Sequence, residues 1–269
     1  MNNQPIGIFD SGLGGLTVLK QINTLLPHES VIYYGDTARA PYGSKAVETL
    51  QVYSQQIVGF LIEEKVKSIV IACNTVSSVG LENLKKHFPS IPIIDIIQPI
   101  VSCMPQIVKP NEVVALIGTE VTISSGVYEE KLNELLPECK IIPQACPLFV
   151  KLIEDGLMND RFPDSVIRQY LDEIMDDHKP DYLILACTHY PLIAHRIQKL
   201  YPEVKLLDPA FAQVEAMQKT LEIKDMQADS NQKAKYKFYA SNLSNVFYKT
   251  VDTIMAGKTD SFIYEELKF

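Results

Sequence analysis

Short apolar segments alternate with longer amphipathic segments through the first third of the chain. Segments with the length and apolar content of buried strands lie at Ile6–Phe9, Val31–Tyr34, Ser68–Ala72 and Ile91–Ile97. Between them, Thr17–Leu26 and Val47–Glu64 repeat apolar residues at helical spacing, and a further helix is expected to end near Lys86. Strands that alternate with helices in this way predict a doubly wound α/β fold with parallel strands.

The same alternation restarts in the second part of the chain. Strands are predicted at Val113–Ile117, Ile141–Pro143, Tyr182–Ala186, Lys205–Leu207 and Lys237–Ala240. Helices are predicted at Ser125–Leu136 and Ser165–Asp177, around Arg196–Leu200, after Asp208 and at the C-terminal end, with a polar segment over Asp225–Lys235. The restart indicates two similar doubly wound α/β domains, with mainly parallel sheets, that face each other across a cleft.

One internal similarity links the two parts. Ser68–Thr75 reads S-I-V-I-A-C-N-T, and Asp181–His189 reads D-Y-L-I-L-A-C-T-H. Each is an apolar strand that ends in Ala-Cys and continues through short polar residues into a helix. Because ligands bind at the carboxyl ends of the strands in open α/β sheets, Cys73 and Cys187 are candidate site residues.

A thiol between a strand and a helix has a chemical use as well as a structural one. Backbone N–H groups at a helix N-terminus lower a thiol pKa from about 8.5, so Cys73 and Cys187 are expected to exchange protons near neutral pH. The alternative for either residue alone is a small buried side chain. A matched pair that faces across a cleft supplies one base for each face of a carbon atom, which is what an amino-acid racemase requires.

Other polar residues flank the two cysteines. The segment Phe9–Gly15, F-D-S-G-L-G-G, lacks both the G-x-G-x-x-G spacing and the lysine of a nucleotide-binding loop. Asp10 in this segment is either a helix N-cap or a carboxylate that binds an ammonium group or tunes a thiol. His189 follows Cys187 by two residues and can share its proton, with Glu154 orienting the imidazole.

A turn-rich loop lies between the second strand and the long helix. Tyr34–Ser44 reads Y-G-D-T-A-R-A-P-Y-G-S. Such a loop either grips a carboxylate through main-chain N–H groups and the Ser44 hydroxyl, or is simply a structured surface loop.

The composition removes several classes of function. The chain has 269 residues, a hydrophobic fraction of 46% and a net charge of −8, which disfavours a nucleic-acid or anionic-membrane surface. Its apolar stretches are far shorter than the roughly 20 residues that span a bilayer, and Met1–Pro5 has no basic targeting pattern. The five cysteines form no C-x-x-C pair, so we expect reduced thiols in the cytoplasm and no metal site. No stretch indicates a pyridoxal lysine or a flavin site, and no cofactor is expected.

Several longer motifs occur in order along the chain. They are I-G-I-F-D-S-G-L-G-G at Ile6–Gly15, the loop Tyr34–Ser44, A-C-N-T at Ala72–Thr75, I-G-T-E-V-T-I at Ile117–Ile123, A-C-P-L-F-V at Ala145–Val150 and A-C-T-H-Y-P-L at Ala186–Leu192. Together they closely resemble the glutamate racemases of the aspartate/glutamate racemase superfamily, nearly from end to end. The resemblance implies a cofactor-independent enzyme that interconverts L- and D-glutamate for peptidoglycan synthesis, with its site between two α/β domains.

The resemblance also implies roles for individual residues. Cys73 and Cys187 are the two acid/base residues, with Asp10 assisting the first thiol and His189 with Glu154 assisting the second. The implied substrate contacts are Asp10, Ser11, Pro41, Tyr42, Gly43, Ser44, Asn74, Thr75, Thr119, Thr122, Thr188 and His189. Residues 1–98 and 208–269 are expected to form one discontinuous domain, with 99–207 inserted as the second. Family members are commonly homodimers, and some bind DNA gyrase.

Three positions depart from the family pattern. Lys151 stands where proline is usual, Gln98 where glutamate is common, and Val76 where alanine is usual. None removes a catalytic residue, but they leave the position of Glu154 open.

Two other functions stay open at this point. One is a racemase or decarboxylase of the same superfamily with another substrate, such as aspartate, although decarboxylase relatives typically keep only one of the two cysteines. The other is a non-catalytic regulatory protein on this fold, which the presence of Asp10, Cys73 and Cys187 disfavours.

Overall fold

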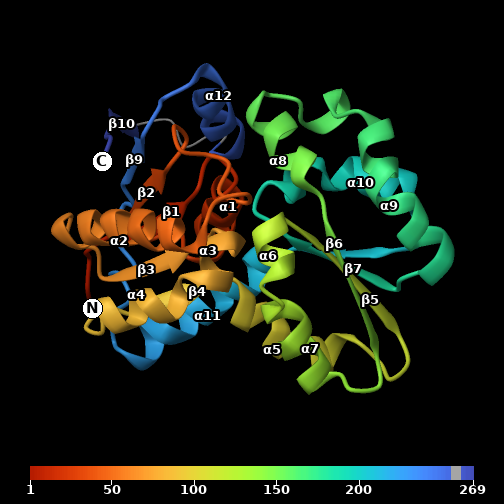
Figure 1. The fold of residues 1–269 in the computed structure, drawn as a ribbon. Coiled ribbons are helices and arrows are strands. Elements are labelled where there is room, and N and C mark those ends of the chain that lie inside the picture. Colours follow the sequence, from red (N-terminus) through yellow and green to blue (C-terminus); the bar gives the residue numbers. More distant parts are fainter. Residues whose placement is uncertain (256–261) are drawn as a thin grey trace.

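Parallel strands build two separate sheets that lie side by side in the molecule (Figure 1). The computed structural model describes residues 1–255 and 262–269, and within these residues one sheet has six strands and the other has four. Every strand pair in both sheets is parallel. The prediction of an α/β fold with two parallel sheets is confirmed.

The six-stranded sheet contains strands from both ends of the chain, in the order β10-β9-β2-β1-β3-β4. Its strands are β1 (Ile6–Asp10), β2 (Val31–Gly35), β3 (Ser68–Ile71), β4 (Ile93–Asp95), β9 (Tyr236–Ala240) and β10 (Phe262–Glu266). The helices of the same chain segments are α1 (Leu16–Leu25), α2 (Val47–Glu63), α3 (Asn74–Val79), α4 (Leu81–His87), α11 (Pro209–Ile223) and α12 (Asn245–Ile254). We call this part the six-stranded half.

The four-stranded sheet comes from the middle of the chain, in the order β6-β5-β7-β8. Its strands are β5 (Val113–Gly118), β6 (Lys140–Ala145), β7 (Tyr182–Ala186) and β8 (Lys205–Leu207). The accompanying helices are α6 (Glu120–Ser124), α7 (Val127–Leu135), α8 (Pro147–Glu154), α9 (Asp164–His178) and α10 (Ala194–Leu200), with the 3₁₀ turns η1 (Asn159–Arg161) and η2 (Tyr190–Ile193). This part is the four-stranded half.

The two sheets repeat one strand order. The order β2-β1-β3-β4 in one half matches β6-β5-β7-β8 in the other, so β3 and β7 occupy equivalent positions. These are the two strands that end in Ala-Cys. The internal similarity seen in the sequence therefore corresponds to equivalent strands of two similarly ordered sheets.

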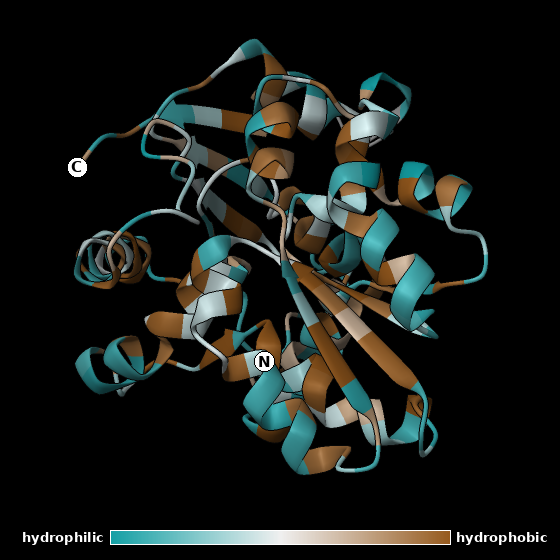
Figure 2. Cartoon of the chain, turned by 45° about the vertical axis from the view of Figure 1, so that its right-hand side comes forward, coloured by the Kyte–Doolittle hydropathy of each residue, from teal (hydrophilic) through white to brown (hydrophobic). Residues whose placement is uncertain are grey.

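Burial explains why the central strands are continuously apolar. Every residue of β1, β2, β3 and β7 is buried, as expected for parallel strands that are covered by helices on both faces. The hydropathy colouring shows brown strands inside and helices with teal outward faces (Figure 2). In α1, for example, Leu16, Leu19 and Ile22 are buried on one side of the helix.

Several elements differ from those expected from the sequence, among them β4, α8 and β10. Strand β4 stops at Asp95, and the predicted strand Ile91–Ile97 is too long because the Asp95 carboxylate accepts hydrogen bonds from the N–H groups of Ile97 and Gln98 and so starts the helix α5 (Ile97–Ile107). Helix α8 begins at Pro147, a residue that fits the first turn of a helix. Strand β10 is a short edge strand with exposed Glu residues, which weakens its apolar signal.

Helix α5 connects the two halves, since it packs against α11 on one side and α7 on the other. It also runs across the predicted domain boundary between residues 98 and 99. The strands of each sheet come from the chain segments that the proposed division assigns to each domain. The division itself stays a prediction.

Candidate active site

The two candidate thiols lie at equivalent strand ends, one in each half. Cys73 follows β3 and is the N-cap of α3, and Cys187 follows β7 shortly before η2. Their side chains are 3% and 5% exposed. Strands β1 and β3 lie side by side with their ends in register, as do β5 and β7. This is where the strand order reverses, which is the usual ligand position in such sheets.

Asp10 ends β1 beside Cys73 and is fully buried. Its carboxylate accepts hydrogen bonds from the Gly12 N–H at 3.0 Å and from the Thr188 hydroxyl of the other half at 3.1 Å. Burial raises the pKa of Asp10, against the opposing charge of His189. The N-cap of α1 is Gly15, so the interpretation of Asp10 as a helix N-cap is wrong.

The environment of Cys73 reverses the predicted direction of its pKa. Burial, with the negative charge of Asp10, raises the pKa of the Cys73 thiol to about 12. Hydrogen bonds from the Val76 N–H and the Ser11 hydroxyl favour the thiolate, but they do not outweigh desolvation. The helix N-terminus therefore does not lower this pKa, and Cys73 carries its proton at neutral pH.

Cys187 has a different neighbourhood, built around His189. The His189 Nδ1 lies 3.8 Å from Cys187 Sγ, and Nε2 lies 2.6 Å from Glu154 Oε1. Burial lowers the pKa of His189, but the hydrogen bonds and charges of Cys187 and Glu154 together raise it well above its ordinary value. The imidazole is then protonated and donates at both ring nitrogens. Glu154 therefore lies where it can orient His189, despite the unusual Lys151.

In the glycine-rich segment after β1, the backbone packs closely against His189. The Leu13 N–H donates to Glu154 Oε1 at 3.1 Å. A Cβ atom on Gly14 would lie 2.5 Å from both His189 Nδ1 and Thr188 Oγ1. Glycine is needed at this position because the two halves approach so closely there.

Polar side chains from both halves meet next to the thiols. The hydroxyl oxygens of Thr75 and Thr119 are 3.0 Å apart, and those of Thr119 and Thr122 are 2.9 Å apart. Asn74, beside Cys73, accepts a hydrogen bond at Oδ1 from the hydroxyl of Tyr128 at 2.7 Å. These groups offer several donors to an anionic ligand in a buried space.

The loop 41–44 contacts the same region less directly. Its Gly43 carbonyl accepts a hydrogen bond from the Val121 N–H of the other half at 3.0 Å. Tyr42 is buried and donates to Asp36, whereas Pro41 and Ser44 are exposed. The roles of these four residues as substrate contacts stay predictions.

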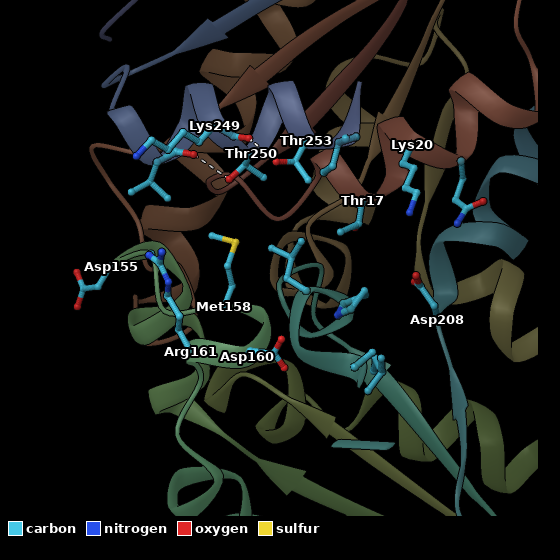
Figure 3. A pocket seen from close by; sticks show the side chains of 18 of the residues that line it. Thr17, Lys20, Asp155, Met158, Asp160, Arg161, Asp208, Lys249, Thr250 and Thr253 are labelled. Atoms are coloured by element: carbon cyan, nitrogen blue, oxygen red, sulfur yellow. Dashed lines mark hydrogen bonds between the residues drawn. The ribbon is translucent and has the colours of Figure 1, made fainter. Parts of the chain in front are cut away.

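A cavity of about 940 Å³ lies between the halves, away from the thiols (Figure 3). Its walls include Thr17, Lys20 and Asp208, and neither cysteine is among the described residues that line it. Thr17 connects this cavity to the thiol region, because its hydroxyl donates to the Thr188 carbonyl at 3.3 Å. Both candidate thiols therefore lie outside the described lining of this cavity.

Neither a metal site nor a membrane span was found. Among residues 1–255 and 262–269, no group of three or more His, Cys, Asp or Glu side chains is arranged to hold a metal ion. No helix in that part of the chain is long and apolar enough to cross a membrane.

No motif or periodicity in the sequence marks Tyr33 and Tyr128 as site residues. The Tyr33 hydroxyl donates to the Gly12 carbonyl at 2.7 Å and so supports the loop beside Asp10. Tyr128 lies on α7, close in sequence to Thr119 and Thr122. Both look like ordinary core residues in the sequence, since only the fold brings their hydroxyl groups to the site.

Comparison with known proteins finds close similarity over the whole chain. Residues 6–217 match the model of the Asp/Glu/Hydantoin racemase family. A glutamate racemase of Sulfurihydrogenibium sp. is 38% identical over 265 residues, which is 98% of each chain. The crystal structure of a glutamate racemase from Francisella tularensis in complex with D-glutamate has a TM-score of 0.89 at 34% identity, covering 100% of this chain and 98% of that one. A glutamate racemase isoform of Bacillus anthracis has a TM-score of 0.88 at 31% identity, covering 100% and 99%.

Proposed function

Because the chain belongs to the Asp/Glu/Hydantoin racemase family, we propose that its buried site interconverts L- and D-glutamate. The enzyme is then an isomerase that acts without a cofactor. The observation that carries the proposal is the pair of buried thiols, Cys73 and Cys187, at equivalent strand ends of opposite halves. Such a pair offers one acid/base group to each face of the substrate Cα.

The two thiols have different neighbours. Cys73 has a raised pKa and holds its proton. Cys187 lies next to the protonated His189, which stabilises a thiolate by hydrogen bonding and by charge. In one direction of the proposed reaction, Cys187 removes the Cα proton and Cys73 delivers one to the opposite face, and the roles exchange in the other direction.

The protons and electron pairs balance over one turnover. The Cys187 thiolate takes the Cα proton, and the electron pair of the broken C–H bond passes to Cα and its carboxylate. The S–H bond of Cys73 then breaks, and its proton forms a new C–H bond on the opposite face. The enzyme is left with a Cys187 thiol and a Cys73 thiolate, the form that converts the other enantiomer by the reverse steps.

The remaining polar groups are suited to an acidic amino acid. Hydroxyl groups of Thr75, Thr119 and Thr122 come from both halves and form a donor cluster. A substrate with two carboxylates needs such donors because burial of an unpaired carboxylate is costly. Asp10, bonded to Thr188, supplies a negative charge for the substrate ammonium group.

Deuterium incorporation tests the two-thiol scheme. We expect the purified protein, given L- or D-glutamate in D₂O, to form the other enantiomer with one deuteron at Cα, while the unreacted substrate gains none at early times. Circular dichroism follows the chirality, and mass spectrometry follows the deuterium. Exchange into the substrate as fast as product forms would show one base that serves both faces, which contradicts the scheme.

Cysteine variants provide a second test of the two-thiol scheme. Cys73→Ser should abolish racemisation in both directions, because each direction uses both thiols. Cys146→Ala is the matched control, since Cys146 is also a buried thiol between a strand and a helix but lies after β6. Near-normal turnover in Cys73→Ser would overturn the mechanism.

Substrate identity is tested by comparing D-glutamate with D-aspartate and an arylmalonate. A preference for glutamate supports the proposal, and a preference for either of the others replaces it. A role in peptidoglycan synthesis follows from D-glutamate production. The homodimer, a gyrase interaction and a cytoplasmic location stay predictions from the family resemblance.

A further inference from the structure

A hydrogen bond between two buried side chains joins the halves beside Cys73. Tyr128, on α7 of the four-stranded half, donates to Asn74 Oδ1 at 2.7 Å. Asn74 is the first residue of α3 in the six-stranded half and follows Cys73 directly. The two residues are 1% and 2% exposed. The contact therefore forms only where the two halves meet.

This bond determines which way the Asn74 amide faces. A buried phenol hydroxyl has to donate its proton, and the acceptor for Tyr128 is Asn74 Oδ1. The amide nitrogen Nδ2 then points away from Tyr128. In the part of the chain that the structure describes, this buried nitrogen has no hydrogen-bond partner. A buried NH₂ group without an acceptor is unfavourable, so it is suited to a ligand that brings one.

We propose that Tyr128 is a positioning residue that, through Asn74, aims an N–H donor at the α-carboxylate of the substrate. The inference rests on the proposed racemisation of glutamate. The α-carboxylate fits because Asn74 adjoins Cys73, whose sulfur must reach Cα. An ammonium group does not fit, since it has no lone pair to accept from Nδ2.

The proposed Asn74 N–H donor acts on the substrate atoms that gain negative charge during the reaction. Removal of the Cα proton spreads negative charge onto the α-carboxylate, and a fixed N–H donor stabilises that charge without rearrangement. Burial, together with the negative charges of Asp95, Asp208 and Cys187, raises the pKa of Tyr128 well above its ordinary value. The hydroxyl therefore stays protonated through the reaction, and the amide keeps its orientation.

A double-mutant cycle tests the proposal with purified full-length variants. The variants are Tyr128→Phe, Asn74→Ala and the two combined, assayed for kcat and KM with D- and L-glutamate. We expect Tyr128→Phe alone to lower kcat/KM about tenfold, the size of effect of a lost hydrogen bond that serves a charged group. In the Asn74→Ala background the same change should cost less than about twofold, because Tyr128 acts only through the amide.

Tyr182→Phe is the matched control. Tyr182 is also a buried tyrosine of the four-stranded half, and its hydroxyl donates to the Ile107 carbonyl at 2.9 Å. Its removal is expected to lower the melting temperature as much as Tyr128→Phe does and to leave kcat/KM unchanged. Equal losses from Tyr128→Phe in both backgrounds, or none in either, would overturn the proposal.

A further variant keeps the proposal testable if Tyr128→Phe does not fold. In Asn74→Asp, Tyr128 holds one carboxylate oxygen and directs the other at the substrate carboxylate. KM should therefore rise above that of Asn74→Ala, and a KM at or below it contradicts the proposed orientation. A wild-type protein that does not racemise glutamate would instead refute the proposed function itself.

Discussion

Asp10 and Cys73 show how burial decides the chemistry of a single residue. A thiol at a helix N-terminus is expected to have a lowered pKa. In the fold, burial and the charge of Asp10 outweigh the nearby N–H donors, and the pKa of Cys73 rises to about 12. Asp10 is itself disfavoured as an anion, because burial raises its pKa too. Ionisation of the Asp10 carboxylate at this buried position therefore destabilises the fold.

Asp10→Asn should stabilise the protein and impair it as an enzyme. A group whose pKa is raised by folding stabilises the fold below its unfolded pKa, and this contribution is lost as pH rises through the folded pKa. The neutral amide avoids that loss, so we expect the melting temperature at pH 7 to rise by about 2–4 °C, with the difference shrinking toward pH 3. The expected fall in kcat is at least about tenfold.

Asp36→Asn is the control for this prediction. Asp36 is also fully buried, but Arg39 Nε donates to its carboxylate at 2.6 Å. Removal of that charge leaves Arg39 without its ion pair, so this variant should melt at a lower temperature than wild type. Thermal denaturation followed by circular dichroism compares the two, and a less stable Asp10→Asn at pH 7 would contradict the argument.

At the level of elements, the contacts of the segment between β1 and α1 show why it contains glycine. The glycine spacing does not fit a phosphate-binding loop, and the structure provides another reason for the glycines. Gly14 allows the backbone of one half to contact His189 and Thr188 of the other. The segment thereby connects the surroundings of the two thiols, because Asp10 lies at one end of it and Glu154 bonds to its Leu13 N–H.

Two glycine substitutions distinguish the effect of close contact between the halves from the effect of helix propensity. In Gly14→Ala, the new Cβ would lie 2.5 Å from His189 Nδ1, so we expect kcat to fall by about tenfold or more as the imidazole is displaced. Gly59→Ala, in α2, meets no atom within 4 Å and should stabilise the protein by about 1 kcal/mol with unchanged turnover. Chemical denaturation and steady-state kinetics measure both effects, and a fully active Gly14→Ala would refute the close-contact role.

At the level of the whole molecule, the candidate catalytic groups are enclosed between the two halves. Cys73, Asn74 and Thr75 of one half and Cys187 and Thr188 of the other are all at most 5% exposed. We therefore expect the halves to separate when substrate enters, and to exclude water when they close. The large cavity near Thr17 gives no direct route, since the thiols do not line it.

Thiol labelling measures this opening. Cys103 and Cys139 are half-buried, whereas Cys73, Cys146 and Cys187 are buried. We expect iodoacetamide to modify Cys103 and Cys139 first, and an excess of D-glutamate to slow labelling of Cys73 and Cys187 but not of Cys146. Peptide mass spectrometry follows each thiol over time. Equal rates at Cys73 and Cys103 without substrate would show that the halves are open in solution.

Much of the fold can be predicted from the sequence alone, and so can the candidate site residues. The alternation of strands and helices predicted the parallel α/β fold, because buried parallel strands must be apolar along their whole length. The repeated Ala-Cys strand ends identified Cys73 and Cys187, and the two strands prove equivalent in the sheet order. Short elements with weak or proline-containing patterns, such as α8 and β10, did not emerge in this way.

Only the tertiary structure decided how these residues affect one another. Burial and the distant Asp10 raise the pKa of Cys73, whereas Cys187 and the distant Glu154 raise the pKa of His189 against the effect of burial. The contact between Tyr128 and Asn74 likewise joins helices of different halves, α7 and α3. A sequence specifies local apolar periodicity and strand ends, because these depend on nearby residues. Desolvation and charge–charge interactions depend on distances in space, and those exist only once the two halves have packed together.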